Sequence, residues 1–395
     1  MNQLRGARRQ LCIVNPFQHG GGAEYQINCL IDVLKPMGRY DIYYLARYTD
    51  PQVAADRYRV VQIGDGGALP MPGYLVDAVP LYRALDRIRP DVIYQRVACG
   101  YTGVCAYYAR ARGARMVWHI AHDSDVSRDS SFHGRNPLRR FLEKRSIEYG
   151  IAHTTHIIAQ TETQSALLAS NYGRAADVVI PNFQPAAEEE LDKAGPLTVV
   201  WVANLKPWKR PEVFVRLAAA LADISNVRFV MAGASHEGGR DREWGDALRR
   251  SIAAATNLEY VGQLSQGAVN ALLARSHIFV NTSVQEGFPN TFIQAWMREV
   301  PVVSLTVNPD GVLDREPVGL FGGTEEGLQQ AVRLLLTDPD TLRRLALASC
   351  AYAMRKHSLG NAGVLAEFLD SDGRGAVAGS RSPDRQGSEA FSGRT

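Results

Sequence analysis

Short apolar runs alternate with amphipathic segments of helical spacing along almost the whole chain. The run Leu11–Phe17, for example, precedes Ala23–Lys35, in which apolar residues recur at the period of a helix with one buried face. Because neighbouring parallel strands must be joined by a long crossover, usually a helix, this alternation predicts an α/β fold with parallel sheets. The first series of expected strands is Leu11–Phe17, Tyr40–Leu45, Val60–Ile63, Asp91–Val97, Met116–Ala121, His156–Gln160 and Val178–Pro181.

The alternation is interrupted at Gln184–Pro196, a segment rich in Pro, Ala and Glu that has no apolar periodicity. Such a segment is typical of a linker between domains. A second series of similar size follows, so we expect two doubly wound domains that face each other across a cleft, with ligands beyond the carboxyl ends of the strands. The strands of the second series are Leu197–Val202, Val227–Ala232, Leu258–Val261, Ile278–Asn281, Val302–Leu305 and Gly319–Phe321.

These boundaries divide the chain into five parts. We expect a flexible leader at 1–10, an N-terminal domain at 11–185, a C-terminal domain at 186–355, a C-terminal helix at 356–370 and a disordered tail at 371–395. The tail is rich in Gly, Ser and Arg and has almost no apolar residues, so it cannot bury a core.

Composition excludes several classes of protein. With 395 residues, 46% of them hydrophobic and 22% charged, the chain resembles a globular enzyme. Its net charge of +3 comes from arginines in the leader and the tail, and the remainder is about −1, so we expect no nucleic-acid partner. The five cysteines have no metal-binding spacing. No apolar run approaches the roughly 18 residues of a membrane span and no signal peptide is evident, so we expect a cytoplasmic protein.

The segment EGFPNTFIQAW, from Glu286 to Trp296, is the most informative motif. It follows the apolar run His277–Ser283, and Gly287, Pro289 and Asn290 oppose a continued strand, so Glu286 is expected on a strand-to-helix turn. The first N–H groups of a helix have no partner inside the helix and attract phosphate. A carboxylate beside them can bind hydroxyls while the turn itself binds a phosphate.

Three further motifs fall at expected strand ends. A glycine-rich run, His19–Glu24, separates the first strand from its helix, and its glycines allow close backbone approach to a ligand. His119 and His122 lie at the carboxyl end of the fifth run, where strand alternation puts them on opposite faces unless the strand ends between them. The segment Val202–Pro211 has lysines at the first strand end of the second domain, where a fixed cation stabilises a diphosphate leaving group.

Together these four segments resemble the retaining GT-B glycosyltransferases of family 4. The resemblance implies a nucleotide-sugar donor, a glycan or lipid-linked acceptor, polysaccharide or lipid-linked glycan synthesis, and no metal or other cofactor. It implies that Glu286, His122 and Lys209 are catalytic, with His119 as the second candidate histidine. It also implies that the last helix crosses back to the first domain. The donor-binding residues that it implies are Gly21, Gly22, Asn204, Arg210, Gly287, Phe288, Pro289, Asn290, Thr291 and Gln294.

The sequence departs from the family pattern at two donor-side positions. Gln294 stands where the pattern has a second glutamate, and Ala203-Asn204 stands where Gly-Arg is usual. Lys206 or Arg210 could supply the missing cation. These losses favour a second hypothesis, a catalytically weak sugar-nucleotide-binding protein. A third, a nicotinamide-dependent oxidoreductase, fits the alternation but lacks G-x-G-x-x-G after the first strand.

The basic segment Arg135–Arg145 allows two interpretations. Leu138, Phe141 and Leu142 share one helical face and are surrounded by arginines and Lys144. The apolar stripe is either part of the core or a contact with anionic lipid at the inner face of a membrane.

Overall fold

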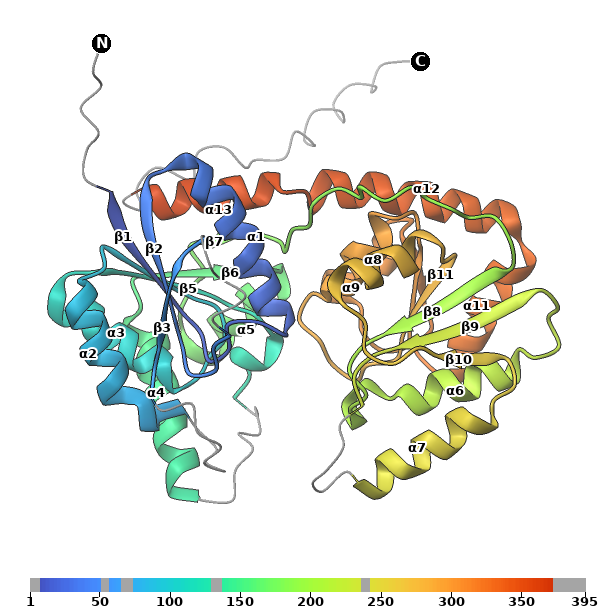
Figure 1. Cartoon of the computed structure of the whole chain (residues 1–395), viewed down its shortest axis with the longest axis horizontal. Helices are drawn as coiled ribbons and strands as arrows, with labels where there is room; N and C mark the ends of the chain where they lie inside the picture. The colour runs from blue at the N-terminus through green and yellow to red at the C-terminus, as the bar shows by residue number, and fades with distance from the viewer. Residues whose placement is uncertain (1–7, 51–56, 65–73, 129–136, 236–241, 372–395) are drawn as a thin grey trace, which may run out of the picture.

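The computed structural model describes residues 8–50, 57–64, 74–128, 137–235 and 242–371, and it contains two parallel α/β domains (Figure 1). The predicted leader residues 1–7 and tail residues 372–395 lie outside this range. Each strand in the described part pairs only in parallel with its neighbours. The predicted fold class, two Rossmann-like domains, is confirmed.

The first sheet has the strand order β3-β2-β1-β4-β5-β6-β7 among the described residues. Strand β1 begins at Arg9, opposite Tyr40, so Arg9 and Gln10 belong to the sheet and not to the predicted leader. The elements are β1 Arg9–Val14, α1 Gly22–Met37, β2 Tyr40–Ala46, β3 Arg59–Gln62, η2 Tyr74–Asp77, α2 Ala78–Ile88, β4 Val92–Gln95, α3 Gly100–Arg112, β5 Arg115–His119, η3 Asp123–Asp125, α4 Pro137–His153, β6 His156–Ala159, α5 Glu162–Tyr172 and β7 Val178–Val179.

The second sheet has the order β10-β9-β8-β11-β12-β13 within the described chain. Its central strands are buried on both faces, which explains their continuous apolar runs. The elements are β8 Leu197–Val202, η4 Pro207–Lys209, α6 Pro211–Ala220, β9 Val227–Ala232, α7 Arg242–Ala254, β10 Leu258–Tyr260, α8 Gln266–Ala274, β11 Ile278–Asn281, α9 Asn290–Trp296, β12 Val302–Ser304, η6 Pro309–Gly311, α10 Val312–Arg315, β13 Gly319–Phe321, α11 Glu325–Thr337, α12 Pro339–Lys356 and α13 Gly360–Asp370.

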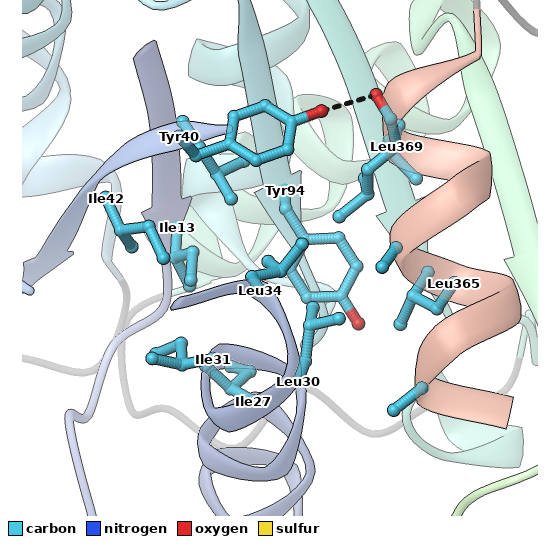
Figure 2. Close-up of a cluster of buried hydrophobic side chains, with 14 of the residues drawn as sticks. Ile13, Ile27, Leu30, Ile31, Leu34, Tyr40, Ile42, Tyr94, Leu365 and Leu369 are labelled. Atoms are coloured by element: carbon cyan, nitrogen blue, oxygen red, sulfur yellow. Dashed lines mark hydrogen bonds between the residues drawn. The ribbon is translucent and has the colours of Figure 1, made fainter. Parts of the chain in front are cut away.

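The last helix packs on the first domain. Leu365 and Leu369 of α13 lie in the same apolar cluster as Leu30 and Leu34 of α1 (Figure 2). The Tyr40 hydroxyl donates a hydrogen bond of 2.9 Å to the Leu369 carbonyl, which is one of the helix's unpaired terminal acceptors. The chain therefore crosses between the domains twice, and the two crossings pair where the Gln184 N–H donates to the His357 carbonyl.

A second contact between the domains caps helix α5. The carboxylate of Asp310, in the second domain, accepts hydrogen bonds from the N–H groups of Glu162 (3.0 Å) and Thr163 (2.9 Å) and from the Thr163 hydroxyl (2.7 Å). A carboxylate is stabilised at a helix N-terminus by the free N–H groups and the helix dipole. The two domains are thus held against each other on one side of the cleft.

Candidate active site

A cleft of about 700 Å³ lies between the carboxyl ends of the two sheets. In the first sheet the strand order reverses between β1 and β4, and in the second between β8 and β11. Such switch points leave a crevice at the strand ends because the two connections leave in opposite directions. The sequence-predicted site residues line this cleft except Arg210 and the second candidate histidine, His119; those that line it are Gly21, Gly22, His122, Asn204, Lys209, Glu286, Gly287, Phe288, Pro289, Asn290, Thr291 and Gln294.

Lys209 and Glu286 form an ion pair inside the cleft, with 20% and 14% of their side chains exposed. Their backbones are tied together. The Thr282 hydroxyl donates to the Lys209 carbonyl (2.6 Å) and in turn accepts from the Trp201 indole N–H (2.9 Å). The turns after β8 and β11 are therefore fixed relative to each other, and a cation and a carboxylate that lie 77 residues apart face one pocket.

The turn that follows Glu286 lies against the first domain. Asn290, the first residue of α9, donates from its amide to the Gly22 carbonyl (2.9 Å) and accepts from Gln26 (2.9 Å). The Phe288 carbonyl accepts from Asn182 (3.1 Å), and the Phe288 ring packs on His357 with centroids 4.5 Å apart. The glycine-rich loop and the Glu286 turn therefore meet directly across the domain boundary.

The structure separates the two candidate histidines. His119 ends β5, is fully buried and hydrogen-bonds the Tyr94 hydroxyl at 2.9 Å, and burial lowers its pKa well below the usual value. His122 lies beyond the strand and lines the cleft. Its Nδ1 accepts the Ser124 N–H (3.0 Å), so a neutral imidazole carries its proton on Nε2. Of the two, only His122 is placed to donate to a ligand.

The cations on the donor side also differ in placement. Lys206 lines the cleft with its Nζ 4.9 Å from the Trp208 ring centroid, whereas Arg210 turns away and pairs with Glu325 at 2.5 Å. Gln294 is buried, and its amide donates to Asn270 at 3.0 Å. Of the two cations considered as substitutes at the diphosphate position, Lys206 is the one that faces the cleft.

Several cleft residues were not among the sequence-predicted site residues. Arg96 follows β4 directly, Gln160 follows β6, and Asn182 lies in the segment after β7. Glu24, at the end of the predicted glycine-rich motif, is 6% exposed, and burial raises the pKa of its carboxyl although Asn15 donates to it. The expected strands Asp91–Val97 and His156–Gln160 include Arg96 and Gln160, and a polar residue close to the carboxyl end of an expected strand was the available signal for both.

Two features are absent from the described residues. They contain no cluster of three or more His, Cys, Asp and Glu that could hold a metal ion. No helix among them combines the length and apolar character that crossing a membrane requires.

Comparison with known proteins agrees with this geometry. Residues 20–184 match the model of "Glycosyltransferase Family 4", and residues 196–338 match that of "Glycosyl transferases group 1". Among solved structures, Anabaena Alr3699/HepE in complex with UDP and glucose superposes with a TM-score of 0.73 and 18% identity, over 92% of this chain and 100% of that one. Sucrose-phosphate synthase from Thermosynechococcus elongatus gives a TM-score of 0.73 and 16% identity, over 92% and 98%.

The class of fold is therefore GT-B. With both of its domains matched by glycosyltransferase models, the chain belongs to the GT-B glycosyltransferases. A curated relative, the D-inositol 3-phosphate glycosyltransferase of Rhodococcus opacus, is 25% identical over 277 residues. That match covers 64% of this chain and 61% of the relative, so the chain spans less than two thirds of the relative's length.

Proposed function

We propose that this protein transfers a sugar from a nucleotide-sugar donor to a hydroxyl acceptor with retention of anomeric configuration. The observation that carries the proposal is the Lys209–Glu286 pair, which sits at the switch point of the second sheet and faces His122 of the first domain. A cation, a sugar-binding carboxylate and a histidine that can donate from Nε2 are thereby gathered in one cleft. The neighbouring structure that contains UDP-glucose supports a donor of this kind.

The proposed reaction assigns one task to each group. Lys209, assisted by Lys206, stabilises the negative charge that grows on the diphosphate as the bond between the anomeric carbon and the phosphate oxygen breaks. Glu286 binds sugar hydroxyls, while Gly287–Thr291 contact the sugar and diphosphate. The acceptor oxygen bonds to the anomeric carbon from the side that the diphosphate leaves, and its proton passes to a departing phosphate oxygen. His122 supports the developing oxocarbenium ion, and no metal takes part.

A screen of nucleotide sugars tests this proposal. We expect one of the UDP-, GDP-, ADP- and dTDP-sugars to raise the melting temperature, because a ligand that binds only the folded state stabilises it. Release of the nucleoside diphosphate with an acceptor, and an NMR coupling that reports the retained configuration, would establish the reaction. Nucleotide binding without turnover on any acceptor would instead favour the catalytically weak binding protein, for which Asn204 and Gln294 are the argument. Absence of binding to all four would contradict both.

We further propose that the protein works at the cytoplasmic face of a membrane on a lipid-linked or polysaccharide acceptor. The stripe on α4 is not core among the described residues, because Leu138, Phe141 and Leu142 are 63%, 55% and 45% exposed. Arginines on the same helix provide charge complementary to anionic lipid, and apolar side chains beside basic ones are typical of interfacial helices.

Vesicle binding tests this membrane contact. We expect the full chain to bind phosphatidylglycerol vesicles, more weakly at high salt, and the triple variant L138S/F141S/L142S to lose most of that binding. The matched control, L334S/L347S, removes exposed leucines of α11 and α12, which lie on the second domain, and should bind as the unaltered chain does. Equal binding by the triple variant would contradict the proposal.

A further inference from the structure

Arg96 occupies the position in the first domain that the Glu286 turn occupies in the second. It follows β4 directly, and β4 stands beside β1 at the point where the strand order of the first sheet reverses. The side chain lines the cleft although only 1% of it is exposed. In a doubly wound sheet, ligands bind at this place, so a ligand of the first domain is expected beside Arg96.

The guanidinium of Arg96 is only partly satisfied. One terminal nitrogen donates to the Asn182 side-chain oxygen at 2.8 Å, while Nε and the other terminal nitrogen have no hydrogen-bond partner. Its nearby acid is Glu24, which forms no ion pair with it in the described chain, and the pKa of Glu24 is raised by burial. Burying a cation without a counter-ion costs free energy, so an anion in the cleft would be favoured.

The other two buried arginines among the described residues each have the carboxylate partner that Arg96 lacks. Arg47 pairs with Asp77 at 2.6 Å, and Arg298 pairs with Glu189 at 2.6 Å. Neither lines the cleft. The buried arginine that faces the cleft is therefore the one without a carboxylate partner.

A second unsatisfied group lines the cleft from the first domain. Gln160, which is 2% exposed, donates from its amide nitrogen to the Ile120 carbonyl at 2.5 Å, so its orientation is fixed. Its amide oxygen has no partner and is able to accept from a hydroxyl. The first domain thus offers free N–H donors on a cation and one oriented acceptor, which together suit a hydroxylated molecule that carries an oxyanion.

We propose that Arg96 binds an oxyanion of the acceptor, a phosphate or a carboxylate close to the hydroxyl that receives the sugar. This assignment rests on the proposed function, and it goes beyond it by naming the chemical class of the acceptor. The donor diphosphate has its own cations, Lys206 and Lys209, on the opposite domain. Arg96 is left for the second substrate, with Gln160 binding an acceptor hydroxyl.

The test monitors the arginine side chains of the full chain by NMR spectroscopy. Protein labelled with 15N-arginine is saturated with the nucleoside diphosphate selected by the donor screen and then titrated with inorganic phosphate. The Nε–H signal of Arg96 is identified as the one absent from the R96K spectrum. We expect phosphate to shift this signal, and R96Q and R96K to bind phosphate about tenfold or more weakly, because a charged hydrogen bond is lost or reduced to a point charge.

The matched control is R216Q, which removes a cation of the second domain that pairs with Glu325 outside the cleft, and it should leave phosphate binding in the nucleotide-saturated protein unchanged. A parallel titration with acetate separates the two sources of the oxyanion: a shift with acetate as well as phosphate indicates a carboxylated acceptor, and a shift with phosphate alone a phosphorylated one.

Three results would overturn the assignment. They are no shift of the Arg96 signal with either anion, a shift that disappears once the nucleotide is bound, and equal loss of nucleotide and phosphate binding in R96K. The last would mean that Arg96 acts through Asn182, which donates to Phe288. If the protein binds no nucleotide, the proposed function is contradicted. The assignment of Arg96 is then judged from the phosphate titration of the nucleotide-free protein alone.

Discussion

Replacing Glu286 by glutamine is expected to lower the turnover number about 10²- to 10³-fold while the protein stays folded. The magnitude is that of removing one preorganised charged group from the groups that contact a reacting centre. The glutamine side chain has the same size as the glutamate that it replaces, and its carbonyl oxygen still accepts from Lys209, so the turn keeps its shape. Initial rates at saturating donor, together with the melting temperature, check this expectation.

The neighbouring ion pair is the matched control. Arg210 is next to Lys209 in the sequence, but it pairs with Glu325, which Arg216 also contacts, and it does not line the cleft. E325Q therefore removes a carboxylate of α11 that pairs with Arg210 of the turn after β8, without changing the proposed site, and it should turn over as the unaltered chain does. Equal losses in E286Q and E325Q would show that charge on the turn matters and that Glu286 has no special part in the reaction.

The fold could be predicted from the sequence because its signal is repeated. The central strands of the parallel sheets are buried on both faces, so they appear as continuous apolar runs, and the helices between them show one buried face. The ends of the strands were harder to predict than the strands themselves. Arg9 and Gln10 lie in β1 although their side chains are polar, because an end of a strand is specified by backbone pairing with Tyr40 and Asp41 and not by burial.

The site was only partly predictable, for a different reason. Motif spacing places Glu286 and Lys209 at strand ends, and two adjacent strands then bring them together. Arg96 has no motif, and its importance depends on the absence of a carboxylate partner, which only the folded chain reveals. Likewise, nothing in a run of basic residues distinguishes Lys206, which faces the cleft, from Arg210, which faces Glu325. The stripe on α4 shows the same limit, since periodicity indicates a face and not what covers it.

The two domains approach each other closely at Gly287, and a larger residue at this position is therefore expected to lower turnover. Gly287, in the second domain, is buried against the strand end that carries His122 in the first. A Cβ placed on it would lie 3.0 Å from the Ala121 carbonyl oxygen and 3.1 Å from the His122 Cα. Both neighbours are backbone atoms, which cannot rotate away as the end of a flexible side chain can. A larger residue at 287 must therefore push the Glu286 turn away from His122.

We expect G287A to lower turnover modestly and G287V about 10- to 100-fold, because overpacking of this kind costs about 1–3 kcal/mol and opposes closure of the cleft. The melting temperature should change little, since the clash lies between the domains and not in either core. Small-angle scattering should show a larger radius of gyration for G287V. G245A, in α7, is the matched control because a Cβ there meets no atom within 4 Å. If G287V kept full turnover and the compact radius, the contact between the Glu286 turn and His122 would not be part of the active state, and the proposed assembly of one site from both domains would be wrong.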